Sequence, residues 1–317
     1  MSSPSSSSSN TTTVDASTMN NRENHQKPIP LKGRSLWSDA FRRLSKNKMA
    51  LTSLIILGLY SLTAFLTYSN IIVSDWSESI GPSYAPPSFE DIRLLFGTDI
   101  FGRSVLYKAI KGTQVAMSVG LIVGIISVVI GVLLGAIAGF FGGIVDEIIV
   151  WFYTTLSSIP NIMLLIAITF ILGKGIFSVY LALGLTYWVT LCRIIRGEVM
   201  RHKDRDYVQS AFSLGASRGR RLFVHIIPNV SHLIIIQFSL LFQTAIKSEV
   251  ILSFIGLGVQ GTPSWGTMID DAKLELARGV WWQLAAATLF MFVIVLALNI
   301  LGDALRDALD PKLKGKD

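Results

Sequence analysis

Six long apolar runs, each bounded by charged or polar residues, dominate the sequence. They cover residues 49–69, 115–141, 145–172, 176–195, 231–256 and 283–305. Each run is close to or above the roughly 20 residues that an α-helix needs to cross a hydrocarbon core about 30 Å thick. Charged residues make up only 15% of the chain and gather between the runs. The sequence therefore predicts an all-α integral membrane protein with six transmembrane helices.

Proline and glycine predict two changes of direction among these runs. Pro160 lies inside the third run and lacks the N–H group that a helix interior needs, so we expect a kink there. Only three residues, 173–175, separate the third and fourth runs, which predicts a tight hairpin.

Glycines recur at helical spacing along the second run. Residues four apart share one face of a helix, and a face of small residues lets another helix approach closely. Gly131, Gly135 and Gly139, with Gly120 and Gly124 before them, are therefore predicted to serve helix packing and not ligand binding.

Lysine and arginine predict the orientation, because short cytoplasmic loops of membrane proteins are enriched in them. Three clusters fall before the first run, between the fourth and fifth runs, and after the sixth. With six crossings, all three lie on one side, so both termini are expected in the cytosol. The net charge of +7 is then a property of cytosolic loops, and no nucleic-acid partner is expected.

Composition also divides the chain. The first 33 residues are rich in Ser, Thr and Asn and too polar to bury a core, which predicts a disordered cytosolic tail. The predicted regions are this tail at 1–33, an N-terminal region with the first span and an external segment at 34–114, a core of five spans at 115–305 that includes the loop 201–228, and a cytosolic tail at 306–317.

The loop at 201–228 interrupts the apolar pattern but still shows helical patterning. Residues 207–214 predict a short helix, and Gly215 suits its left-handed C-terminal cap. Ser217 is placed to cap a second short helix, which Pro228 closes. Three interpretations fit this pattern: a DNA-reading helix-turn-helix, which its tethering between two spans disfavours, a loop held at lipid headgroups, and a docking element for a partner protein.

The same loop resembles the EAA loop of ABC importer permeases. That family has Glu-Ala-Ala, then Gly, then Ile-x-Leu-Pro, and here Gln209-Ser210-Ala211, Gly215 and His225-Ile226-Ile227-Pro228 stand at the same spacing. Leu214-Gly215-Ala216-Ser217 is similar to the dipeptide, oligopeptide and nickel branch. Three further segments resemble that branch in the right order, namely Gly97-Thr98-Asp99 with Gly102-Arg103, Leu252 to Val259 with Pro263-Ser264-Trp265-Gly266, and Asn299 to Pro311.

The resemblance implies a type I importer fold in the bacterial cytoplasmic (inner) membrane. It also implies that the chain contacts a second permease, two cytosolic ATPase subunits, an external solute-binding protein and the lipid bilayer. The chain has no GxxxxGK[ST] phosphate loop, so ATP and Mg²⁺ are expected on the ATPases and no enzyme activity or cofactor on this chain. The resemblance assigns ATPase coupling to Asp206, Gln209, Ser210, Ala211, Gly215, Ala216, Ser217 and Pro228.

Some residues depart from the family pattern. Gln209 and Ser210 replace the Glu and the first Ala, which removes a carboxylate from the loop, and Asp206 either supplies charge in its place or is a solvated acid. Two charged residues fall inside the fifth run, where ionisable groups are costly and default to functional candidates. Glu249 and Lys247 are therefore predicted in the translocation pathway. Helix packing is the equal alternative for Glu249, and contact with the second permease is the alternative for Lys247.

The expected function is a permease subunit that forms, with a second permease, a path for di- or oligopeptides. The alternatives are the same machinery importing nickel or another small solute, and an ATP-independent secondary transporter. An intramembrane protease is disfavoured because the four histidines lie in the tail, the loop and a span edge, and because HExxH is absent.

Overall fold

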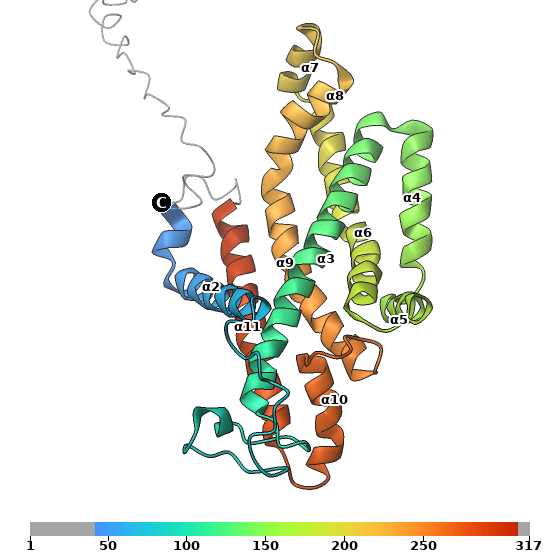
Figure 1. Cartoon of the computed structure of the whole chain (residues 1–317). Coiled ribbons are helices and arrows are strands. Elements are labelled where there is room, and N and C mark those ends of the chain that lie inside the picture. The colour runs from blue at the N-terminus through green and yellow to red at the C-terminus, as the bar shows by residue number, and fades with distance from the viewer. Residues whose placement is uncertain (1–41, 310–317) are drawn as a thin grey trace, which may run out of the picture.

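Helices account for most of residues 42–309, the part of the chain that the computed structural model describes, and no β-strand occurs there. Figure 1 shows the long helices side by side, with α7 and α8 at one end of the molecule and α10 at the other. The α-helices are α2 Lys48–Tyr68, α3 Val105–Phe141, α4 Gly143–Ser157, α5 Asn161–Leu172, α6 Ile176–Lys203, α7 Asp206–Ser213, α8 Arg218–Arg220, α9 Ile227–Phe254, α10 Trp265–Leu276 and α11 Trp282–Leu309.

Membrane-spanning helices follow the predicted runs in order. Within the described residues, five helices are long and apolar enough to cross a membrane, and α4 with α5 gives a sixth crossing if the bent pair is one span. The two helices meet at 91°, across the break that ends in Pro160. The predicted kink is confirmed, and it is sharp enough to turn α5 across the bundle (Figure 1).

The core forms where α3 meets its neighbours. Cβ atoms built on Gly131, Gly135 and Gly139 would lie 2.8, 2.6 and 2.5 Å from carbonyl oxygens of α6, so only glycine permits this approach of the two backbones. Farther along α3, Gly120 and Gly124 lie against the rings of Phe242 and Phe238 of α9. The α2 helix lies outside this core and is tied to α11 by a hydrogen bond of 2.9 Å from Tyr60 Oη to the Phe290 carbonyl.

Two predicted boundaries are wrong. The helix of the fourth run does not end near residue 195, because α6 continues to Lys203 and includes Arg196. The second short helix does not close at Pro228 either. Helical structure runs unbroken over Arg218–Phe254, with a π-helical turn at Arg221–Ile226 directly before the proline. The wider turn leaves room for the ring of Pro228, whose missing N–H costs little near the start of a new helical register.

Both predicted tails extend outside the described residues. The Ser-rich segment 1–33 lies wholly outside them, and so does most of 306–317, since the description ends at residue 309. The proposed division of the chain into regions therefore stays a prediction.

Candidate functional site

The predicted docking loop forms an exposed helix, turn and helix at one end of the molecule (Figure 1). Gly215 has φ +84° and follows α7 directly. Its N–H donates to the Phe212 carbonyl at 2.9 Å, and the Ala216 N–H donates to the Ala211 carbonyl at 3.0 Å. These two bonds make a Schellman cap, which satisfies the last carbonyls of α7 and reverses the chain. Ser217 Oγ then accepts from the Arg220 N–H at 3.3 Å and caps the next helix.

Apolar contacts fix α7 to the membrane bundle. Val208 is buried in one cluster with Leu222 and Ile226, which continues into α3 and α6, and Ala211 is also buried. These contacts leave the opposite face of α7 free for a partner.

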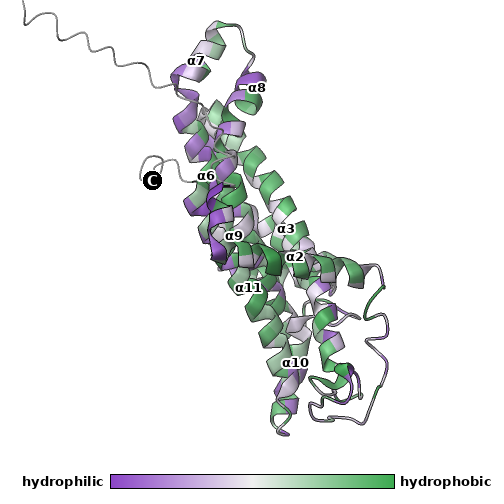
Figure 2. Cartoon of the chain, turned by 90° about the vertical axis from the view of Figure 1, so that its left-hand side faces the viewer, coloured by the Kyte–Doolittle hydropathy of each residue, from purple (hydrophilic) through white to green (hydrophobic). Residues whose placement is uncertain are grey.

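The exposed face of this end carries both polar and apolar groups. Asp206, Gln209 and Ser210 are exposed, and Gln209 Nε2 donates to the Lys203 carbonyl at 3.2 Å. Leu214, next to Gly215, is an apolar side chain that is 88% exposed. Hydrophilic residues otherwise dominate α7 and α8 in Figure 2.

A second feature is a cavity of about 650 Å³ between the α4–α5 break, α6 and α9. The volume lies within the range of ligand sites in proteins. Most of its polar lining consists of hydroxyl and amide groups, and several lining residues, among them Asn161 and Thr190, are exposed. The polar side chains that line it belong to Ser157, Ser158, Asn161, Thr186, Tyr187, Thr190, Arg193, Gln237 and Thr244.

The 91° break creates this cavity, because α5 turns away from the line of α4 and leaves the polar faces of α6 and α9 uncovered. Side chains at the break satisfy the freed backbone groups: Ser157 Oγ donates to the Tyr153 carbonyl and Ser158 Oγ to the Thr155 carbonyl, at 2.8 and 2.7 Å. The sequence does carry a signal for this cavity, because Thr186, Thr190 and Arg193 recur in steps of four and three and so share one face of α6.

The two charged residues predicted for the pathway lie elsewhere. Glu249 is 1% exposed, and its Oε1 accepts from Ser253 Oγ at 2.6 Å. Ser253 Oγ also accepts from the Val259 N–H at 3.3 Å, so Glu249 supports the turn that follows α9. Lys247 is exposed on the surface of α9. Neither residue lines the cavity, and the contacts of Glu249 favour the packing alternative.

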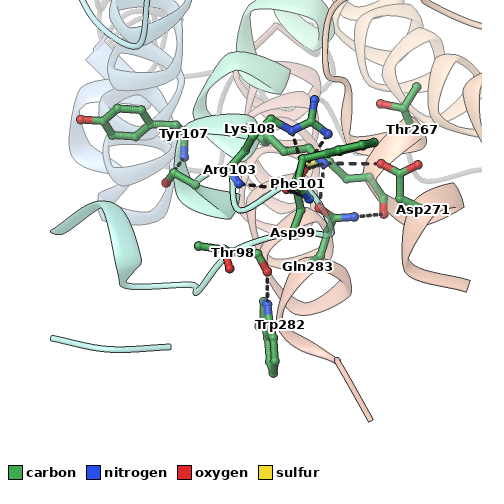
Figure 3. Close-up of polar contacts among 12 residues, drawn as sticks. Thr98, Asp99, Phe101, Arg103, Tyr107, Lys108, Thr267, Asp271, Trp282 and Gln283 are labelled. Carbon is green, nitrogen blue, oxygen red and sulfur yellow. Dashed lines mark hydrogen bonds and ion pairs between the residues drawn. The ribbon is translucent and has the colours of Figure 1, made fainter. Parts of the chain in front are cut away.

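At the opposite end from α7, the segment before α3 is fastened by Asp99 (Figure 3). Its carboxylate is 1% exposed and accepts from Arg103 Nε at 2.8 Å and from Lys108 Nζ at 3.0 Å. Lys108 Nζ also donates to Gln283 Oε1 of α11 at 2.8 Å. Burial opposes ionisation of Asp99, but the charge of Lys108 and the hydrogen bonds outweigh it and hold the pKa of Asp99 below its ordinary value.

Glu275 of α10 lies near this cluster, but its pKa is shifted in the opposite direction to that of Asp99. It is 3% exposed, and its Oε2 has no hydrogen-bond partner among the described residues. Burial raises the pKa of Glu275 to about 7, with Lys108 opposing the shift and Asp271 and Asp99 adding to it. The sequence resemblance did not single out this residue.

The helical bundle, the polar cavity at a broken span and the exposed helix-turn-helix define a multi-pass membrane transport protein of the permease class. Residues 131–315 match the family model described as "Binding-protein-dependent transport system inner membrane component". Residues 35–90 match the model "N-terminal TM domain of oligopeptide transport permease C". The chain belongs to this family of transport-system permeases.

Curated relatives agree over nearly the whole chain. It is 36% identical to the oligopeptide transport system permease protein OppC of Bacillus subtilis, over 90% of this chain and 93% of the relative. The corresponding protein of Escherichia coli K12 is 37% identical over 92% of this chain and 96% of its own length. The dipeptide transport system permease protein DppC of B. subtilis is 35% identical over 93% and 92% of the two chains.

Proposed function

We propose that this chain is one of two permease subunits of a peptide importer that is driven by ATP. The relatives named above are permeases of oligopeptide and dipeptide transport systems, which favours peptides over nickel or another small solute. The polar cavity supports a passage for a solute rich in amide groups, because its hydroxyl and amide side chains match the hydrogen-bonding groups of a peptide backbone.

In this proposal the α7–α8 end is cytosolic and meets an ATPase subunit. The lysine and arginine bias of the loops supports the orientation, and it also places both termini in the cytosol. The opposite end, with the Asp99 cluster and α10, would face an external solute-binding protein. ATP and Mg²⁺ would be bound by the ATPases, and this chain would carry no catalytic group.

One observation carries the coupling mechanism: the helix that follows Gly215 is unbroken from Arg218 to Phe254. An ATPase that moves α7 moves a short helix whose Val208 packs in one cluster with Leu222 and Ile226, at the start of that long helix. Because α9 lines the cavity through Gln237 and Thr244, the displacement reaches the passage without crossing a flexible joint. Coupling thus depends on the rigid cap at Gly215.

Variants of Gly215 test the proposal. No atom lies within 4 Å of a Cβ built there, so a substitution acts through backbone conformation alone. Valine strains a left-handed residue by about 1–2 kcal/mol, whereas asparagine tolerates that region. We expect Gly215→Val to lower ATP-driven peptide uptake by about tenfold in proteoliposomes holding the whole assembly, and Gly215→Asn to keep most of it.

Two results would contradict the proposal. Equal uptake by Gly215→Val and the parent protein would remove the loop from coupling. Peptide uptake that needs an ion gradient and no ATP would instead identify a secondary transporter.

A further inference from the structure

Arg193 is the one charged side chain among the residues that line the cavity. It lies on α6, ten residues before the helix ends at Lys203, a rise of about 15 Å along the axis. Its side chain is exposed and lies beside the polar groups of the cavity, so its contacts decide what it can bind.

The contacts of Arg193 hold the guanidinium in place without neutralising it. Its Nη2 donates to Ser157 Oγ at 2.8 Å, and its Cζ lies 4.8 Å from the centre of the Tyr153 ring. Among the described residues, no carboxylate lies within 4 Å of it. Most of the five N–H donors of the fork therefore stay available on the cavity side.

The next arginine along the helix shows a different arrangement. Arg196 makes a two-pronged ion pair with Asp146 of α4, with Nη2 at 2.6 Å from Oδ2. That arginine is satisfied within the chain and does not line the cavity. The fold therefore pairs one of two neighbouring arginines and leaves the other open to the passage.

We infer that Arg193 binds the C-terminal carboxylate of a peptide in transit, an inference that rests on the proposed function. A planar guanidinium forms two parallel hydrogen bonds with a carboxylate, which a neutral amide cannot reproduce. The cavity offers no acidic residue among its lining side chains, so this half of the passage favours the negative end of a peptide over its amino end. Hydroxyl and amide groups on α6 and α9 then face the peptide backbone.

The test compares free-acid and C-terminally amidated forms of one peptide in proteoliposomes that hold the whole assembly. The solute-binding protein is the same throughout, so the ratio of variant to parent uptake for each peptide reports only the effect of the substitution in the permease. We expect Arg193→Gln to lower ATP-driven uptake of the free acid by about tenfold or more and that of the amide by less than about twofold. Arg193→Lys keeps the charge and should restore part of the free-acid uptake.

Lys48→Gln provides the control, because Lys48 is an exposed cation at the start of α2 and does not line the cavity. It should change neither ratio. Equal losses for both peptides in Arg193→Gln would overturn the inference and assign Arg193 to packing or to the second permease. No loss for either peptide would also overturn it.

A loss that appears only with anionic lipids present would show that Arg193 binds a lipid phosphate instead, and it too would overturn the inference. The proposed function fails separately, if the parent assembly shows no ATP-driven peptide uptake at all.

Discussion

Replacing Asp99 with asparagine should destabilise the end of the molecule opposite α7. The carboxylate is buried and is the acceptor for Arg103 and Lys108, with Arg103 Nη2 at 2.7 Å and Lys108 Nζ at 3.0 Å from Oδ2. An asparagine that keeps its oxygen toward the N–H groups of Phe101 and Arg103 turns its NH₂ group toward both cations. The substitution thus removes one negative charge and places the NH₂ donor of asparagine opposite the N–H donors of Arg103 and Lys108.

The size of the destabilisation depends on the hydrogen-bond acceptors that remain for Lys108 after the substitution. Its side chain is 4% exposed, and breaking a buried ion pair by removing one partner costs about 3–5 kcal/mol. Gln283 Oε1 still accepts from Lys108 at 2.8 Å, so we expect the lower part of that range. For a domain of this size, the loss should lower the melting temperature by roughly 6 °C or more.

Thermal unfolding of the detergent-purified assembly measures this effect. The double variant Asp99→Asn with Lys108→Met should melt higher than the sum of the two single changes predicts, because it removes the uncompensated buried charge. Asp270→Asn is the control, since its ion pair with Lys273 is partly exposed and contributes about 0–1 kcal/mol. Strict additivity, or an Asp99→Asn melting temperature equal to that of the parent, would refute the reasoning.

Two further changes probe packing and protonation. Gly135→Ala places a Cβ 2.6 Å from the Cys192 carbonyl oxygen, which forces α3 away from α6 and should lower the free energy of unfolding by about 1–3 kcal/mol, measured as a lower melting temperature. The control is Gly58→Ala, which meets no atom within 4 Å and should be neutral or mildly stabilising. Equal effects of the two variants would show that the close approach of α3 and α6 does not limit stability. The pKa of Glu275 is raised to about 7 in the folded protein, from an ordinary 4.5, so between these two pH values the folded state binds a proton that the unfolded state does not. The contribution of Glu275 to the free energy of unfolding therefore falls as the pH rises from 4.5 to 7, and it is constant above pH 7. Glu275→Gln should therefore flatten the melting temperature between pH 5 and pH 8, and an unchanged pH profile would exclude this carboxyl as the cause.

The sequence alone determined the membrane class, the succession of spans and the place of the docking loop. Long apolar runs admit few structures in lipid, because every backbone group must be hydrogen-bonded within the segment. Pro160 and Gly215 were equally readable, since a missing N–H and a left-handed φ are local requirements of a single residue. These predictions needed no knowledge of which helices pack together.

Only the tertiary structure decided which polar residues share a surface. Residue 193 falls in the fourth predicted run, but only the bend at Pro160 shows that Arg193 lines a cavity together with residues from α9. For Glu249 the sequence left the pathway and helix packing open, and only the fold shows its contact with Ser253 at the turn after α9, which favours packing. The charge of a side chain is written in the sequence, whereas its partners depend on contacts between segments far apart in the chain.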